Sequence, residues 1–283
     1  MKKITITIIL TLLGVIGYNQ LSVKVADKYF SELSFAKALE YYEELATKEN
    51  PKKQHLKRTA ECYLKLGNTK KAEYWYSQII KSGIVTTEEL IEYAYVLKSN
   101  KKYTESNNVF HMVFKKDKNN PVALGHLENR NYHRDLRKDA KRINLKKVYF
   151  NTSYDDFSPV LLKGKDSVGT ELMFCSNRKV GGFSNSKASF DNTYFLDLYK
   201  VISADSSVKA NLIKSTKTKY HDGPICFSNQ GTVMYLTRNN FIDGKKRKDK
   251  KGHMNLKLFI ATKQGEEWSK LKEFKYNSDQ FSL

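Results

Sequence analysis

Residues 221–240 read HDGPICFSNQGTVMYLTRNN, and this stretch predicts a β-hairpin. The run Pro224–Phe227 is short, apolar and rich in β-forming residues, and Thr232–Thr237 has the same character. Residues 229–231 (Asn-Gln-Gly) between them are turn formers, with glycine where a positive φ costs little. We therefore expect a strand, a tight turn and a second strand, in that order.

The same order of residue types occurs earlier in the chain. Residues 154–160 (YDDFSPV) lead to residues 171–178 (ELMFCSNR), and Arg178 precedes Arg238 by 60 positions. Leu198–Val201 also precedes Leu258–Ala261 by 60 positions, which gives each copy a later strand. Copies of this length with about four strands each are typical of β-propeller blades, which stack because a single blade cannot bury both faces. A third copy begins at residue 276, so residues 146–283 are expected to be a partial β-propeller of two blades and the start of a third.

A second periodicity, of 34 residues, runs from residue 19 to about residue 121. Small and aromatic residues alternate in it as they do in tetratricopeptide repeats, in which each unit is a pair of antiparallel helices. Residues 122–143 continue as a further helical stretch that we expect to cap the array. The predicted architecture is α+β and multidomain, with a tetratricopeptide α-solenoid over residues 21–145 followed by antiparallel four-stranded blades. The five recurring sets are Ala26, Ala60 and Ala94; Tyr29, Tyr63 and Leu97; Ala38, Ala72 and Ser106; Tyr42, Tyr76 and Phe110; and Leu45, Ile79 and Val113.

The first residues predict export. Lys2 and Lys3 precede an apolar run over Ile4–Ile16 that is interrupted only by threonines and one glycine. This pattern is that of a secretory signal peptide, assigned to residues 1–20. The run is shorter than the ~20 apolar residues of a spanning helix, so an uncleaved anchor is the second interpretation. We therefore expect the protein to be exported.

The charge and cysteine content of the chain indicate which kinds of partner or cofactor it could bind. The 283 residues carry 50 Lys and Arg against 30 Asp and Glu, a formal net charge of +20. Such a balance suits an acidic polymer, an anionic membrane or nucleic acid as partner, but lysines spread over solvated faces are the favoured explanation. The cysteines Cys62, Cys175 and Cys226 match no metal-ligand spacing, and we expect three buried free thiols. No cofactor is expected.

Catalytic motifs are absent from the sequence. It contains no G-x-S-x-G, no H-E-x-x-H, no phosphate-binding loop and no C-x-x-C, and we expect no enzymatic activity. His221 and Asp222 occupy the position of Asp155 and Asp156 in the earlier copy, which indicates a hydrogen-bonded blade corner. Equivalent arginines that end equivalent strands are expected to brace neighbouring blades.

Two surfaces are candidate binding sites. The helical repeat register predicts a groove for a protein partner, since solenoid grooves bind extended or helical segments. A dense basic run between two strands of the second blade predicts a solvated loop that could hold an acidic polymer, but it carries no interleaved aromatic residue, so nucleic acid is not expected. The groove residues are Gln54, Lys57, Glu61, Lys65, Glu88, Ile91, Tyr95 and Lys98. The loop residues are Lys245, Lys246, Arg247, Lys248, Lys250 and Lys251.

The order of these features resembles the OmpA-like envelope proteins of Bacteroidetes. The segments that carry the resemblance are D-F-S-P-V at 156–160, H-D-G-P to T-R-N-N at 221–240 and N-S-D-Q-F-S at 277–282. That family includes the propeller component of the type IX secretion machinery. Its members continue into a carboxypeptidase-regulatory-like β-domain and an OmpA-like domain that binds peptidoglycan.

This resemblance implies a scaffold or adaptor that binds an envelope or secretion-machinery protein. It also implies a periplasmic location, peripheral to the outer membrane. The sequence ends at Leu283, before the family's peptidoglycan-binding domain, so we expect a truncated or interrupted gene product, or a fragment of a longer chain, that contacts peptidoglycan only through the missing part. An alternative function is a propeller-based binding module for an anionic glycan or envelope polymer.

Overall fold

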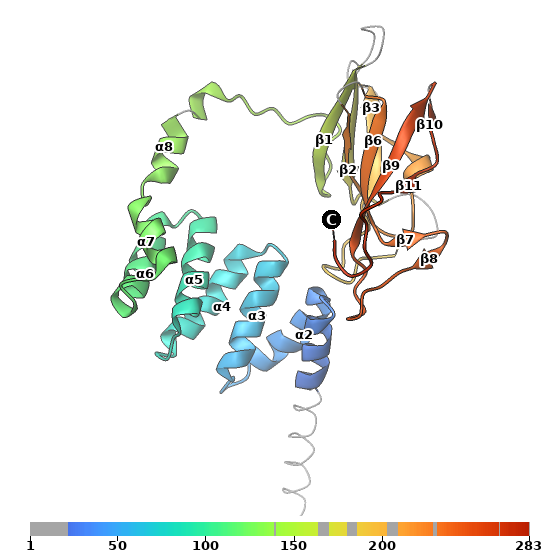
Figure 1. The fold of residues 1–283 in the computed structure, drawn as a ribbon. Helices are drawn as coiled ribbons and strands as arrows, with labels where there is room; N and C mark the ends of the chain where they lie inside the picture. Colours follow the sequence, from blue (N-terminus) through green and yellow to red (C-terminus); the bar gives the residue numbers. More distant parts are fainter. Residues whose placement is uncertain are drawn as a thin grey trace, which may run out of the picture. The chain divides into compact units, whose positions relative to one another are not determined.

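A computed structural model describes residues 22–138, 140–163, 170–179, 186–202, 209–228, 231–265 and 267–282. The predicted signal peptide and residues 229–230 of the predicted turn lie outside these ranges. The chain divides into two compact units. Unit 1 comprises Met1–Leu145 with Ser189–Asp191, and unit 2 comprises Lys146–Ala188 with Asn192–Leu283. The described residues form α-helices and antiparallel sheets, so the fold is α+β (Figure 1).

Unit 1 is a row of helices in which successive helices from α2 to α7 pack on one another (Figure 1). Residues 22–31 are helical and precede this row. The helices are α2 (Phe35–Ala46), α3 (Lys53–Lys65), α4 (Thr69–Lys81), α5 (Thr87–Ser99), α6 (Tyr103–Lys116), α7 (Pro121–Glu128), α8 (Tyr132–Lys138) and the 3-10 turn η1 (Ala140–Arg142).

The 34-residue repeat coincides with burial. Ala26, Ala60 and Ala94 are all fully buried, and the other four sets are buried at every position except Tyr29, which is half-buried. The small side chains let neighbouring helices approach closely, while the aromatic rings fill the space beside them. The hydroxyls of Tyr42 and Tyr76 donate hydrogen bonds to carboxylates, so neither is buried without a partner.

Side chains in the connecting segments fix where helices begin. The Asn68 side chain accepts a hydrogen bond from the Lys71 N–H at the start of α4, and Asn120 accepts one from the Ala123 N–H at the start of α7. Thr86 and Glu89 form a reciprocal capping box at the start of α5. Each of these bonds satisfies an N–H group that the helix itself leaves without a partner.

We predict that Thr86→Ala destabilises unit 1 by about 1 kcal/mol, because the Glu89 N–H loses the hydroxyl that caps it. Urea unfolding followed by far-UV circular dichroism measures this loss. Thr104→Ala is the matched control, since Thr104 is exposed on α6 and α6 has no side-chain cap. An equal loss in both variants would show that the capping box contributes nothing specific.

The stretch expected to cap the array is broken into short pieces. Residues 129–131 separate α7 from α8, and no residue of α8 is buried. Three apolar residues of this stretch, Tyr132, Leu136 and Ile143, are exposed. The contacts that α8 makes come from His133, whose ring stacks on Tyr103 with centroids 4.0 Å apart, and from Arg137, whose guanidinium lies 5.8 Å from the centre of the same ring.

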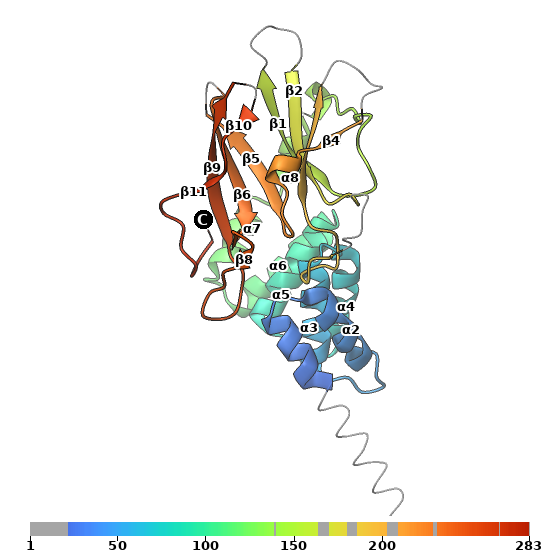
Figure 2. The same ribbon diagram turned by 90° about the vertical axis from the view of Figure 1, so that its right-hand side faces the viewer.

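Unit 2 contains two antiparallel meanders (Figure 2), and neither sheet is closed into a barrel or a propeller. The predicted hairpin is present, since β5 pairs with β6 and Gly231 adopts a φ of 65°. The first sheet has the order β1 (Asp156–Lys163), β2 (Thr170–Ser176), β3 (Asp197–Ile202) and β4 (Asn211–Leu212). The second has the order β10 (Glu267–Trp268), β9 (Leu256–Gln264), β6 (Val233–Asn239) and β5 (Asp222–Phe227), with β11 (Lys272–Glu273) also on β9. The short strands β7 (Phe241–Ile242) and β8 (Lys245–Lys246) form a separate pair, and the 3-10 turn η2 (Lys214–Thr216) precedes β5.

The two sheets share one core. Met173, Cys175 and Leu198 from the first sheet belong to the same buried cluster as Leu236 and Phe259 from the second. Apolar side chains on facing sheets exclude water from both, which favours their association.

The cysteine prediction was wrong in one of three positions. Cys62 and Cys175 are buried free thiols, but Cys226 is exposed. Successive side chains of a strand point to opposite faces, and Ile225 takes the core-facing position in β5. Cys226 therefore points away from the shared core.

Candidate functional site

The expected groove begins on α3. Gln54, Lys57, Glu61 and Lys65 are spaced by three or four residues and therefore lie along one side of the helix. Gln54 and Lys65 are exposed, while Lys57 and Glu61 are half-buried. Arg58 holds the Glu61 carboxylate at 2.8 Å, and the Lys57 ammonium lies 4.0 Å from it. The α3 residues thus present mixed charges, with the carboxylate already paired.

The rest of the expected groove is on α5. Glu88, Tyr95 and Lys98 are exposed, and Ile91 is half-buried. The pKa of Glu88 is lowered by hydrogen bonds with its own backbone and with Thr86, and also by the charge of Lys57 on α3. The Lys53 ammonium of α3 pairs with the Glu89 carboxylate of α5 at 2.7 Å, so the N-terminal ends of the two helices lie close together. We call the eight predicted residues together the α3–α5 face.

The C-terminal end of the α3–α5 face opens into a depression that we name the α5–α7 hollow. Its volume is about 330 Å³, at the lower end of the range for ligand pockets. Two predicted residues, Tyr95 and Lys98, contribute to it. The lining comprises Tyr95, Lys98, Pro121, Val122, Gly125, His126, Asn129 and Tyr132.

His126 lines the hollow and is half-buried. Its ring stacks on Phe110 with centroids 3.9 Å apart and an interplanar angle of 25°. Burial and the nearby charge of Lys98 lower the pKa of His126 below its usual value. A neutral imidazole at physiological pH therefore leaves Lys98 as the charged group of the lining.

The α7 side of the hollow was not predicted as a binding surface. The 34-residue register contains a signal for it, because Gly125 occupies the position of Lys57 and Ile91 in the two preceding units. A glycine at a position that otherwise carries a long side chain indicates open space at that point of the face.

Two residues of the predicted basic loop, Lys245 and Lys246, form β8, which pairs with β7. All six basic residues of the loop are exposed. The Lys246 ammonium lies 5.1 Å from the centre of the Tyr220 ring, and Arg247 pairs with Glu273 at 3.6 Å. The side chains of Lys245, Lys248, Lys250 and Lys251 make no ion pair within the described residues.

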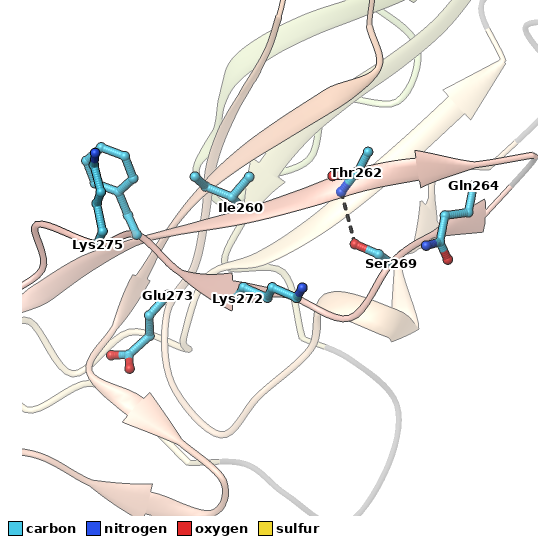
Figure 3. A pocket seen from close by; sticks show the side chains of 8 residues that line it. Ile260, Thr262, Gln264, Ser269, Lys272, Glu273 and Lys275 are labelled. Atoms are coloured by element: carbon cyan, nitrogen blue, oxygen red, sulfur yellow. Dashed lines mark hydrogen bonds between the residues drawn. The ribbon is translucent and has the colours of Figure 1, made fainter.

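A second depression lies beside β9, where residues 269–271 interrupt the edge between β10 and β11 (Figure 3). Its volume is about 410 Å³. The Ser269 hydroxyl accepts a hydrogen bond from the Thr262 N–H at 3.0 Å and so serves the sheet edge. The charged residues that line this second depression are Lys272, Glu273 and Lys275. Glu273 is the residue that pairs with Arg247. This arrangement offers surface charge and no nucleophile with an activating base.

The repeated arginines have structural partners. Arg178 pairs with Asp156 at 2.6 Å, and Arg238 pairs with Asp222 at 2.5 Å. Each also donates to a backbone carbonyl that precedes its own sheet, that of Phe150 for Arg178 and that of Thr216 for Arg238. The expectation that they brace neighbouring blades was therefore wrong, because each arginine ties together parts of its own repeat.

The corner at His221 and Asp222 is hydrogen-bonded, as expected. His221 Nδ1 accepts a hydrogen bond from the Leu196 N–H at 3.1 Å. The Asp222 carboxylate accepts hydrogen bonds from the Arg238 guanidinium and from the Thr218 N–H. Within the described ranges, no three or more His, Cys, Asp or Glu side chains are grouped so that they could hold a metal ion.

None of the helices in the described part of the chain combines the length and apolar character needed to cross a membrane. A comparison with family models finds no match, and a comparison with curated proteins finds none either.

Proposed function

We propose that this chain is a non-enzymatic scaffold or adaptor of the cell envelope that binds a protein partner along the α3–α5 face. In this proposal the helices from residue 22 to 116 are tetratricopeptide units, and the two sheets are blades of an incomplete propeller. The predicted signal peptide and the resemblance to OmpA-like envelope proteins support a periplasmic location at the outer membrane, with a link to type IX secretion.

The repeat register is the observation that carries the proposal. The same positions of successive units are buried, so the positions between them form a repeated outward face on α3 and α5. Solenoid repeats present such faces to extended or helical segments of other proteins. The Asp–Arg pairs and the hydrogen-bonded corner in unit 2 use their polar groups for structure, which supports a binding role rather than catalysis.

The test is photo-crosslinking in the native host with a benzophenone amino acid at Gln54, an exposed residue of the α3–α5 face. Tyr74 is the matched control position, because it is exposed on the intervening helix α4. We expect a discrete crosslinked protein from Gln54 and not from Tyr74. Equal crosslinking from both positions, or none from Gln54, would count against the proposal.

The polymer-binding alternative rests on the four lysines of the basic loop that have no ion-pair partner in the described residues. If the loop holds an anionic polymer, retention of the full chain on dextran sulfate should fall steeply with added salt. Replacing these four lysines with uncharged residues should then abolish that retention while leaving crosslinking from Gln54 unchanged.

A further inference from the structure

We propose that the α5–α7 hollow receives one aromatic or large aliphatic side chain from an acidic segment of a partner protein, with a carboxylate of that segment on Lys98. This inference rests on the proposed function and names the chemistry of the partner. It combines three observations: an exposed apolar lining, a missing side chain at Gly125 and an unpaired positive charge.

The apolar lining is exposed to solvent although it is concave. Tyr95, Val122 and Tyr132 are 47%, 36% and 60% exposed, and all three line the hollow. Large apolar side chains that gather in one depression mark a binding site more often than scattered ones do. One partner side chain would cover all three at once.

The absence of a side chain at Gly125 leaves room in the α5–α7 hollow. A Cβ added at this residue would have no atom within 4 Å, whereas the same repeat position carries Lys57 in one unit and Ile91 in the next. Glycine is also unfavourable inside a helix by roughly 0.5–1 kcal/mol relative to alanine. The residue therefore opens the hollow at a cost in helix stability.

The charge of the site selects an acidic partner. The Lys98 ammonium makes no ion pair with any described residue, and Glu128 is exposed but not part of the lining. The lining contains no carboxylate, so Lys98 brings an uncompensated positive charge to the hollow. A positive group beside an apolar depression favours a segment that has carboxylates beside its apolar residue.

Binding of a labelled peptide tests the inference. The probe is a fluorescein-labelled Gly-Glu-Glu-Phe-Glu-Glu-Gly peptide, and the comparison peptide has alanine in place of phenylalanine. Fluorescence anisotropy with the full chain should show at least about tenfold tighter binding of the phenylalanine peptide, the effect expected for burying one ring. A peptide with glutamines in place of the glutamates should bind more weakly than the probe.

Variants of the chain locate the binding. Gly125→Leu places a large side chain where an added Cβ would meet no neighbouring atom, and we expect it to weaken binding of the probe at least about tenfold. Lys98→Ala should weaken it about fivefold. Lys81→Ala is the matched control, since Lys81 is an exposed lysine at the end of α4 and belongs to neither the α3–α5 face nor the hollow, and it should leave the affinity unchanged. Far-UV circular dichroism verifies that Gly125→Leu is folded.

Absence of probe binding, or binding that Gly125→Leu and Lys98→Ala leave unchanged, would overturn the inference. Equal affinity for the phenylalanine and alanine peptides would do the same, because it would indicate attraction by charge alone. If the full chain instead dimerises and Gly125→Leu makes it monomeric, the occupant is a second copy, and the acidic partner is excluded. Crosslinking from Gln54, which lies outside the hollow, still decides the proposed function in each of these cases.

Discussion

Replacing Asp222 with alanine is expected to destabilise unit 2 by about 3–5 kcal/mol, the usual loss when one partner of a buried ion pair is removed. Asp222 is fully buried, and its carboxylate lies 2.5 Å from the Arg238 guanidinium. In Asp222→Ala the guanidinium keeps the Thr216 carbonyl but has no charge partner in a site that is closed to water. Each unit holds one tryptophan of the chain, so Trp268 fluorescence in a Trp75→Phe background reports urea unfolding of unit 2 alone.

The control for this loss is a solvated ion pair on the first sheet. Glu171 and Lys200 pair at 3.1 Å, and the Lys200 side chain is exposed while that of Glu171 is half-buried. Glu171→Ala should cost less than about 1 kcal/mol, because water replaces the partner of the remaining lysine. Similar losses in both variants would contradict the assignment of a structural role to the buried pair.

The pH dependence gives the Asp222 prediction a second readout. Burial raises the pKa of Asp222 to about 6, although Arg238 and Thr218 act in the opposite direction. A folded-state pKa above the unfolded value of about 3.8 means that the folded chain binds this proton more tightly. The stabilising contribution of the group is then fully present below pH 4 and is lost as the pH rises through 6. The destabilisation by Asp222→Ala should therefore be larger at pH 5 than at pH 7.5.

These arginine partners show what repeat spacing can and cannot predict. The two arginines are 60 positions apart, and this spacing identifies them as equivalent. Their aspartates are 66 positions apart, because 22 residues separate the members of the first pair and only 16 separate those of the second. The longer connection in the first copy hides the pairing from a search at constant spacing, so only the folded chain reveals it.

The helical half was more accessible to prediction than the hollow at its end. A repeat of 34 residues fixes which side chains face the interior, since packing between helices allows only small or well-fitting residues there. Between α7 and α8 that constraint weakens. The Asn129 amide donates to the Gly125 carbonyl at 2.9 Å just past the end of α7, and α8 then packs through His133 on Tyr103. Apolar periodicity over residues 122–143 suggests one buried face, but these local contacts determine which residues remain exposed.

The second large effect is expected in unit 1, where Tyr76→Ala should cost about 3–5 kcal/mol. Tyr76 is among the largest fully buried side chains, and burial raises the pKa of its hydroxyl, which stays protonated and donates to Glu92 on α5 at 3.0 Å. Urea unfolding followed by far-UV circular dichroism measures the loss.

Two further variants on the same helix separate the contributions to that loss. Tyr76→Phe keeps the ring and should cost only about 1 kcal/mol for the hydrogen bond. Tyr74→Ala removes an exposed ring from α4 and should cost about 0.5 kcal/mol. A Tyr74→Ala loss as large as that of Tyr76→Ala would refute the repeat register as the source of stability. A loss of stability that decreases in the order Tyr76→Ala, Tyr76→Phe, Tyr74→Ala would instead show that each repeat is stabilised by the ring that it buries against the next helix.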